Sequence, residues 1–307
     1  MSASYAPVVV FAYNRPDHLS RTLDALSRAE GARDTALWLF CDGPKTGQPT
    51  APVEAVRGVA REPRWAELFA SVRVVVAEHN KGLAKSIITG VSEVLRKADR
   101  VIVIEDDLLV ASDFLRFVNA CLEFYRDDSS VGSVTGFCPL KAAPPDYTYD
   151  VMAVPRNCSQ GWATWTNRWQ QVDWDVSTAS DLWRDAALRR RFNAAGSDRC
   201  DRLRRQLEGR IDSWSIRFGL WQTMSGKYTI YPAHNRVLNI GYDGSGVHSR
   251  LGQATNDTMA GDPQPFKLTG VAEDEAVLRA FQEIYSGSPL RRFVRAMRIN
   301  FQALMTR

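Results

Sequence analysis

Two kinds of hydrophobic pattern alternate along residues 1–140. Short runs of consecutive apolar residues, typical of strands buried on both faces, are separated by stretches with apolar residues every three or four positions, typical of amphipathic helices. The predicted strands cover residues 8–12, 37–41, 72–77, 101–104 and 131–135, and the predicted helices lie around residues 19–26, 53–60, 83–95 and 114–125, with Asp17 and Ser112–Asp113 as N-terminal caps. This order predicts an α/β fold with a mostly parallel, doubly wound central sheet flanked by helices.

Polar side chains follow four of these strands at the point where each strand ends. They are Asn14 and Arg15, Asp42, His79 and Asn80, and Glu105–Asp107. Ligands of doubly wound sheets bind outside the carboxyl ends of the strands, so we expect these side chains to line one edge of the sheet.

Glu105, Asp106 and Asp107 directly follow four β-branched residues. Carboxylates are costly to bury without partners, and hard cations such as Mg²⁺ or Mn²⁺ take oxygen ligands that they share with substrate phosphates. The stretch therefore predicts a divalent cation with its bound anion. A solvated acidic turn, or a charge cluster at a helix N-terminus, is the alternative.

The second half of the chain has a different pattern. A Pro-rich polar loop at 141–150 precedes a tryptophan-rich stretch at 157–183, a charged helical region at 186–209, a strand at 228–232 and a glycine-rich loop at 241–252. We predict one domain over 1–250, with a nucleotide-binding half (1–140) and an acceptor half (141–250), and a helical C-terminal extension over 251–307.

The tail at 289–307 has the pattern of a basic amphipathic helix. Its apolar stripe contains Leu290, Phe293, Val294, Met297, Phe301, Leu304 and Met305, and Arg291, Arg292, Arg295 and Arg298 lie off that stripe. Such a helix either lies in a membrane interface or docks on protein, including a second copy in a homodimer.

Composition narrows the class of protein. The chain has 307 residues, 45% hydrophobic and 24% charged, with a net charge of +4, as in an ordinary soluble globular protein and unlike a nucleic-acid-binding protein. The five cysteines are widely spaced without a CxxC pattern, and no apolar run approaches the roughly 18 residues of a membrane span. The N-terminus shows no basic stretch followed by an apolar one, as a secretion signal would have. Together with the cysteine pattern, this leads us to expect a cytoplasmic location.

The strand-end motifs resemble those of the GT-A nucleotide-sugar glycosyltransferases, a family 2-like group, and most closely the N-acetylglucosaminyltransferase I type. Glu105-Asp106-Asp107-Leu108 resembles that family's variant of the Asp-x-Asp motif, and Val110–Phe114 resembles the segment that follows it. The likeness is good over 8–140, weaker to about 250, and does not cover the tail. It implies a GT-A, Rossmann-like fold.

The resemblance also implies an activity and its residues. The activity is inverting, metal-dependent transfer of a sugar from a nucleotide-sugar, with a UDP-sugar favoured, to a hydroxyl of a glycan or glycolipid acceptor. Asp107 would be the direct ligand of Mn²⁺ or Mg²⁺, and Glu105 and Asp106 would hold the ribose and metal-bound water. Arg15, Asp42 and His79 would surround the nucleotide. Alternatively, Asp42 makes a turn and His79 caps the next helix.

An inverting transfer needs a general base for the acceptor hydroxyl. The segment Ile211–Trp214 stands where the family has Trp-Asp-Asp-Trp, and it implies Asp212 as the base, although Ile211 and Ser213 depart from the pattern. The alternatives are that Asp212 only caps a helix at 213–224, or that Asp173 or Asp175 is the base.

Two later features are less specific. The segment 235–241 resembles a late segment of the family and leads into the glycine-rich loop, where His248 either completes the metal shell or contacts phosphate or solvent. Trp162 and Trp165 either stack on sugar or pack in the core, with Trp165 and Trp169 on one helix face.

Two other functions fit parts of the sequence. A sugar nucleotidyltransferase shares the sheet and the acidic ligands, but the turn at 13–16 lacks the glycine-rich basic loop that holds a triphosphate. A catalytically degenerate glycan- or nucleotide-binding module is compatible with the altered segment around Asp212.

Overall fold

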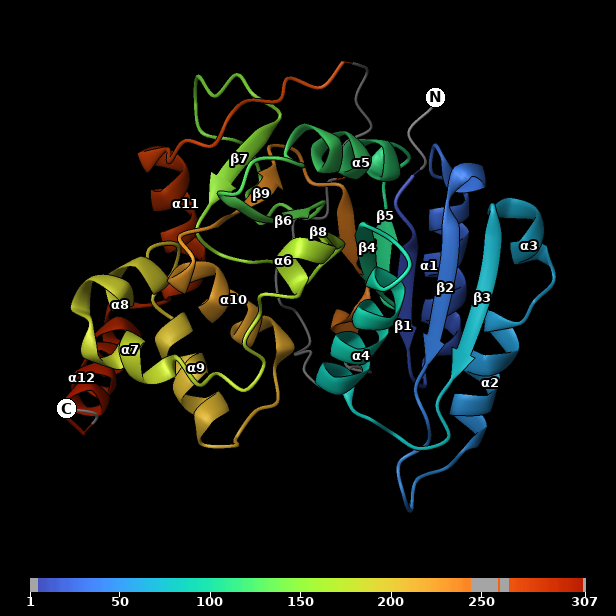
Figure 1. Ribbon diagram of the computed structural model, residues 1–307, viewed down its shortest axis with the longest axis horizontal. Coiled ribbons are helices and arrows are strands. Elements are labelled where there is room, and N and C mark those ends of the chain that lie inside the picture. Colours follow the sequence, from blue (N-terminus) through green and yellow to red (C-terminus); the bar gives the residue numbers. More distant parts are fainter. Residues whose placement is uncertain (1–4, 244–258, 260–264, 306–307) are drawn as a thin grey trace.

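The computed structural model describes residues 5–243, 259 and 265–305. Its centre is an eight-stranded sheet with the strand order β3-β2-β1-β4-β8-β6-β9-β7. The strands are β1 (Val8–Ala12), β2 (Ala36–Cys41), β3 (Ser71–Val76), β4 (Arg100–Glu105), β6 (Val131–Thr135), β7 (Val151–Val154), β8 (Trp162–Trp165) and β9 (Tyr228–Pro232). Helices flank this sheet, so the predicted α/β class is confirmed (Figure 1).

Helices cover both faces of the sheet because successive residues of each strand point to opposite sides. Val8 and Val10 pack toward α1 and α5, whereas Val9 and Phe11 pack toward α4 and α10. The helices are α1 (Pro16–Ser27), α2 (Ala51–Ala60), α3 (Arg64–Leu68), α4 (Leu83–Leu95), α5 (Phe114–Phe124), α6 (Thr166–Trp169), α7 (Ala179–Arg184), α8 (Ala186–Phe192), α9 (Arg199–Leu207), α10 (Trp214–Met224), α11 (Glu275–Ser286) and α12 (Pro289–Met305).

The sheet is parallel where the βα alternation is strongest. Strands β3, β2, β1 and β4 run in parallel, as predicted, and β9 runs parallel to β6. The tryptophan-rich segment supplies β8, which lies antiparallel between β4 and β6, and β7 pairs antiparallel with β9. Both halves of the chain therefore build one sheet.

Strand β8 corrects the prediction for the tryptophans. Trp165 is the last residue of β8 and not part of a helix, so Trp165 and Trp169 do not share a helix face. Trp162 stacks on Trp169 and Trp214 on the α10 side, while the Trp165 indole N–H donates to the Leu122 carbonyl. Both Trp162 and Trp165 are core residues.

The predicted caps differ from the observed ones. Helix α1 begins after Arg15 without a side-chain cap, so Asp17 lies in its first turn. Asp113 precedes α5 but makes no capping bond, because its Oδ2 accepts from Arg236 Nε at 3.0 Å. Both side chains of this ion pair are 1% exposed.

The tail forms the predicted helix, α12, but docks through its other face. Ile299 packs against the cluster of α7 and α9, whereas Leu290, Phe293 and Met297 are 72%, 63% and 58% exposed. The side chains of Phe301, Leu304 and Met305 lie outside the described part. Val277 and Phe281 of the neighbouring α11, which the sequence pattern did not single out, are buried against β7 and β9.

Two simple properties follow from the fold. All five cysteines are free thiols. Within the described ranges, none of the helices has the length and apolar character needed to cross a membrane.

Candidate functional site

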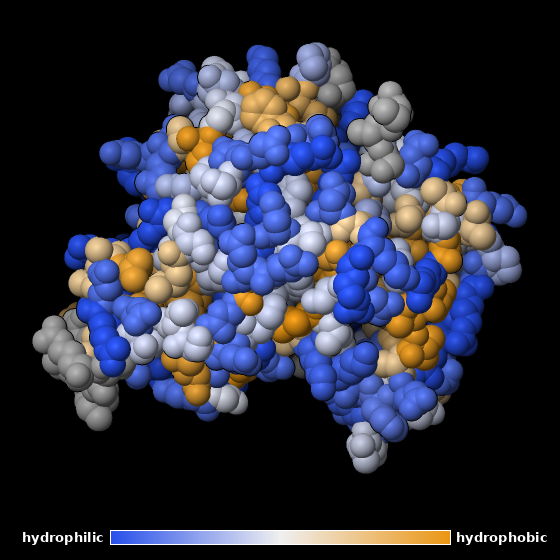
Figure 2. Space-filling view, in the orientation of Figure 1, coloured by the Kyte–Doolittle hydropathy of each residue, from blue (hydrophilic) through white to orange (hydrophobic). Residues whose placement is uncertain are grey.

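A cavity of about 630 Å³ opens at the carboxyl ends of the parallel strands. Tyr13–Arg15 after β1, Asp42 after β2 and Glu105–Asp107 at the end of β4 line it, together with Asp212 from the second half of the chain. Figure 2 shows the surface indented at its lower edge, between the loop that follows β2 and the loop that precedes α10 in Figure 1. Side chains from distant segments of the sequence thus share one concave site.

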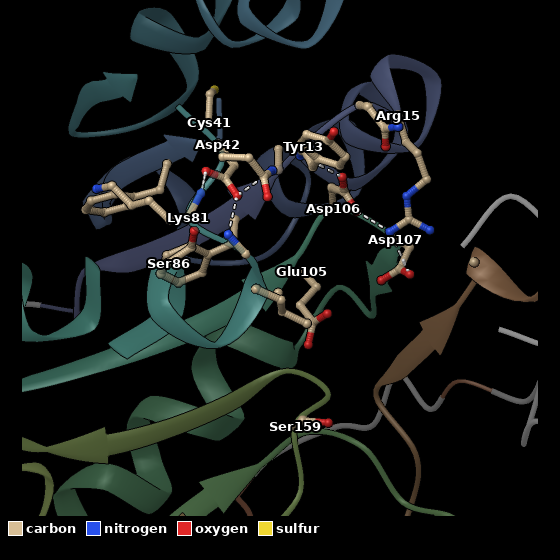
Figure 3. A pocket seen from close by; sticks show the side chains of 18 of the residues that line it. Tyr13, Arg15, Cys41, Asp42, Lys81, Ser86, Glu105, Asp106, Asp107 and Ser159 are labelled. Atoms are coloured by element: carbon tan, nitrogen blue, oxygen red, sulfur yellow. Dashed lines mark hydrogen bonds and ion pairs between the residues drawn. The ribbon is translucent and has the colours of Figure 1, made fainter. Parts of the chain in front are cut away.

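Arg15 forms ion pairs with two of the three strand-end carboxylates. Its Nη2 donates to Asp107 Oδ2 at 2.9 Å and also to Asp106 Oδ1 (Figure 3). Burial alone would lower the pKa of Arg15, but Asp106 and Asp107 raise it. Burial raises the pKa of Asp106 to about 6 in spite of the guanidinium beside it. One guanidinium thus faces two carboxylates, so Arg15 offsets the charge of only one of them.

Glu105 is different from its two neighbours. Among the residues that the structure describes, none donates a hydrogen bond to its carboxylate or forms an ion pair with it. Burial, followed by the negative charges of Asp107 and Asp106, raises the pKa of Glu105 to about 8. In Figure 3 the Glu105 carboxylate lies apart from Arg15, facing the side of the cavity where Ser159 lies. It is the cavity acid most in need of a cation.

Asp42 holds two loops together. Its carboxylate accepts from the backbone N–H groups of Gly43 (2.9 Å), Lys81 (2.8 Å) and Gly82 (3.2 Å) and from the Asn80 amide (3.0 Å). A Cβ on Gly43 would lie 2.3 Å from the carbonyl carbon of His79, so the turn needs glycine there. The turn-forming role expected as an alternative is thus observed. Contact between Asp42 and a bound nucleotide stays a prediction.

His79 does not join the other predicted residues. Its side chain is exposed and is absent from the lining of the cavity. The N-cap of α4 is Gly82, without a side-chain cap, so the alternative that His79 caps this helix is wrong. The backbone of His79 packs against Gly43 instead.

Three cationic side chains that the sequence analysis missed also line the cavity: Lys45, Lys81 and Arg210. Lys45 lies in the loop after β2, with its Nζ 5.7 Å from the centre of the Tyr13 ring. Lys81 directly follows His79 and Asn80 in the loop after β3. The sequence could have indicated Lys45 and Lys81, because each closely follows the end of a predicted strand.

The late segment reaches the carboxylates through a second, two-stranded sheet. Strand β10 (Val237–Asn239) pairs antiparallel with β5 (Leu108–Val110), and the Ile240 N–H donates to the Asp107 carbonyl at 2.9 Å. A Cβ on Gly241 would lie 2.2 Å from Asp107 Oδ2, so only glycine fits here without a shift. The 235–241 segment thus closes one wall of the site.

Asp212 lines the same cavity from the loop before α10. Its side chain is 62% exposed and forms an ion pair with Arg217. The N-cap of α10 is Ser213, whose hydroxyl accepts from the Ile216 N–H, so the alternative that Asp212 merely caps this helix is wrong. Asp173 accepts from Ser177 and Thr178, and neither Asp173 nor Asp175 lines this cavity.

The acids fit a cation site completed by substrate and water better than a site built only from protein side chains. No group of three or more His, Cys, Asp or Glu side chains that could hold a metal occurs in the described ranges, and His248 lies outside them. Mg²⁺ commonly binds through one or two carboxylates together with substrate phosphates and water. Asp107 and Glu105, facing a cavity with lysines, fit that pattern.

Comparison with known families adds no further identification. No model of a known protein family matches this chain. The functional argument therefore rests on the geometry of the cavity and on the motifs that line it.

Proposed function

We propose that this protein is an inverting, metal-dependent glycosyltransferase that uses a nucleotide-sugar, with a UDP-sugar favoured, and a hydroxyl of a glycan acceptor. The observation that carries the proposal is the shared cavity: Glu105–Asp107 and Arg15 at the strand ends face the same space as Asp212. Its volume of about 630 Å³ falls within the usual range for small-molecule sites of roughly 300–1,000 Å³.

The strand-end side supports diphosphate binding. Lys45 and Lys81 place two ammonium groups on the lining, and Arg15 adds a guanidinium that can fork onto phosphate oxygens. Asp107 and Glu105 would hold the divalent cation, which, when bound, stabilises negative charge on the leaving diphosphate. A cation bound there would offset the burial and the neighbouring negative charges that raise the pKa of Glu105.

The second half of the chain supplies the residue for proton removal. Asp212 is exposed enough to meet an acceptor hydroxyl, and its carboxylate can take the proton as the new bond forms. The ion pair with Arg217 restrains the orientation of this carboxylate. A base in the same cavity as the leaving-group site suits a displacement with inversion.

Two measurements test the proposal. Purified protein, incubated with a panel of UDP-, GDP- and dTDP-sugars, Mn²⁺ and mixed glycan acceptors, should release the nucleoside diphosphate from at least one donor. Calorimetry should show UDP binding that depends on Mn²⁺, and Asp107→Ala should weaken it by about tenfold or more, as expected for loss of a metal ligand.

Asp175→Ala is the matched control, since Asp175 is exposed and absent from the lining of the cavity. It should bind UDP like the unmodified protein. Unchanged Mn²⁺-dependent UDP binding in Asp107→Ala would refute the metal assignment. Binding of UDP without release from any donor would instead indicate a non-catalytic binding module.

A further inference from the structure

A second cavity of about 280 Å³ adjoins the first. Ser159, Gln160 and Tyr242 line both of them, so the two spaces meet at the Ser159–Gln160 segment and the Tyr242 side. If the first cavity holds the donor, a group bound in the second lies next to it. This is where part of an acceptor would be expected.

The second cavity carries an excess of positive charge. Arg156, Arg199 and Arg202 line it, and no Asp or Glu occurs among the described residues of its lining. Arg199 and Arg202 are three residues apart on α9 and therefore share one helix face. Arg156 reaches the cavity from the segment after β7.

Only one of the three guanidiniums has a carboxylate. Arg156 binds Asp198 through two hydrogen bonds, of 2.8 and 3.0 Å, and lies 3.7 Å from the centre of the Tyr285 ring. Arg199 is 2% exposed, and it donates to the Pro155 carbonyl and to the Asn157 amide oxygen, each at 2.9 Å. Neither partner is charged.

Arg202 is the third and most accessible of the set. Its side chain is exposed, and in the part of the chain that the structure describes it has neither a hydrogen bond nor an ion pair. The three guanidinium groups at this cavity are thus accompanied by one carboxylate, that of Asp198.

The fold makes specific room for this charge. A Cβ on Gly219 of α10 would lie 1.9 Å from Arg199 Nη2, so α10 leaves space for the guanidinium at that position. Burial, and then repulsion from Arg156, lowers the pKa of Arg199 to about 9. A buried cation without a counter-ion is costly, and a bound anion would offset that cost.

We propose that this second cavity binds an anionic group, a carboxylate or a phosphate monoester, carried by the acceptor. Planar guanidiniums match both oxyanions through paired hydrogen bonds. The role as an acceptor subsite rests on the proposed glycosyltransferase function, whereas anion binding itself does not. The enzyme would then select acidic glycans or phosphorylated acceptors over neutral ones.

The test uses the full chain saturated with UDP and Mn²⁺, so that the first cavity is filled. Ligand-detected NMR titrations would compare methyl β-D-glucuronide and glycerol 1-phosphate with neutral methyl β-D-glucoside. We expect one of the two anions to bind at least about tenfold more tightly than the glucoside, as for a charge-assisted hydrogen bond. The anion that binds more tightly identifies the source of the negative charge.

Arg202→Gln should weaken binding of that anion by about tenfold, because Arg202 is the unpaired guanidinium. Arg190→Gln on α8 makes the same charge change at an exposed position outside both cavities and should leave anion binding unchanged. Equal binding of the anions and the glucoside, or equal anion binding by Arg202→Gln and the unmodified protein, would overturn the inference.

UDP binding by the same preparation is measured in parallel and reports on the first cavity alone. If UDP fails to bind while the anion still binds without it and requires Arg202, the proposed function fails and the anion site stands. If UDP binds and the anions do not, the proposed function stands and the anion site is refuted.

Discussion

Each strand-end acid at the cavity has a different set of partners. Asp42 is committed to backbone N–H groups, and Asp106 and Asp107 share Arg15, whereas Glu105 has no such partner among the described residues. The residue types alone did not separate these roles, because hydrogen-bond partners come from distant segments. The separation leaves Glu105 as the strand-end acid that a cation could bind without competing with Arg15.

The role of Asp212 can be tested by removing its basicity while keeping its shape. Asp212→Asn should bind UDP with unchanged affinity but lose at least about a hundredfold in kcat, the lower range for general-base catalysis. The readout is single-turnover transfer alongside calorimetric UDP affinity. Retained turnover would show that another residue is the base. Reduced UDP affinity would show that Asp212 takes part in binding the donor.

The Asp198–Arg156 pair predicts a pH-dependent contribution to stability. Burial alone would raise the pKa of Asp198, but Arg156 holds it below its ordinary value of 3.8. A carboxyl with a lowered pKa in the folded state stabilises the protein above the unfolded pKa, and this contribution is lost as the pH falls. Stability from this pair should therefore be present at pH 7 and decline below about pH 4.

Asp198→Asn should cost about 3 kcal/mol of unfolding free energy at pH 7, since it leaves Arg156 buried without a counter-ion. The cost, measured by denaturant unfolding, should shrink toward pH 3. Asp181→Asn, at an exposed position of α7, should change stability little at either pH. A cost for Asp198→Asn that does not vary with pH would contradict the assignment.

At the scale of elements, α12 leaves an apolar face without a partner in the described structure. Leu290, Phe293 and Met297 are spaced along one face and are exposed, while Ile299 packs on the protein. Residues 289–305 contain four arginines and no acidic residue, and Arg292 and Arg298 are exposed. Apolar and basic groups together favour an anionic membrane surface as the occupant.

We therefore expect the protein to sediment with vesicles containing phosphatidylglycerol, less so at high salt because surface charges are screened. The triple variant L290S/F293S/M297S should lose this binding by about tenfold or more, since each buried apolar side chain contributes about 1.5 kcal/mol or more. Phe124→Ser, at an exposed position of α5, should bind like the unmodified protein. Salt-independent dimerisation without vesicle binding would favour a second copy instead.

At the scale of the molecule, the buried Asp113–Arg236 pair joins the two halves of the chain. Arg236 Nε donates to Asp113 Oδ2 at 3.0 Å, and the guanidinium carbon lies 4.0 Å from the centre of the Phe117 ring. The Ala111 N–H also donates to the Arg236 carbonyl at 3.0 Å. These contacts hold β10 beside β5 and so keep Gly241 against Asp107.

Arg236→Met retains an apolar side chain over Phe117 but leaves Asp113 buried without its cation. We expect a loss of about 3–5 kcal/mol in unfolding free energy, measured by denaturant titration. Arg279→Met removes an ion pair whose guanidinium side chain is 69% exposed and should cost less than about 1 kcal/mol. The double variant R236M/D113N should recover part of the loss, and failure to recover would show that the arginine acts mainly through packing.

The sequence by itself determined the elements whose signals are local. Hydrophobic periodicity predicted β1 and α4 with their observed bounds, and it placed polar residues at the ends of β1, β2 and β4. Buried strands and amphipathic helices leave such patterns because each residue's burial follows from its position in one element. The position of the candidate site at one sheet edge follows from the same signals.

Only the tertiary structure decided which segments meet. Strand β8 inserts between β4 and β6, Arg15 pairs with Asp106 and Asp107, and Gly241 closes on Asp107. These contacts depend on strand pairing across long loops and on competition between side chains for the same partner, neither of which leaves a periodic trace in the chain. The arginine-lined cavity has the same origin, because its charges come from the segment after β7 and from α9.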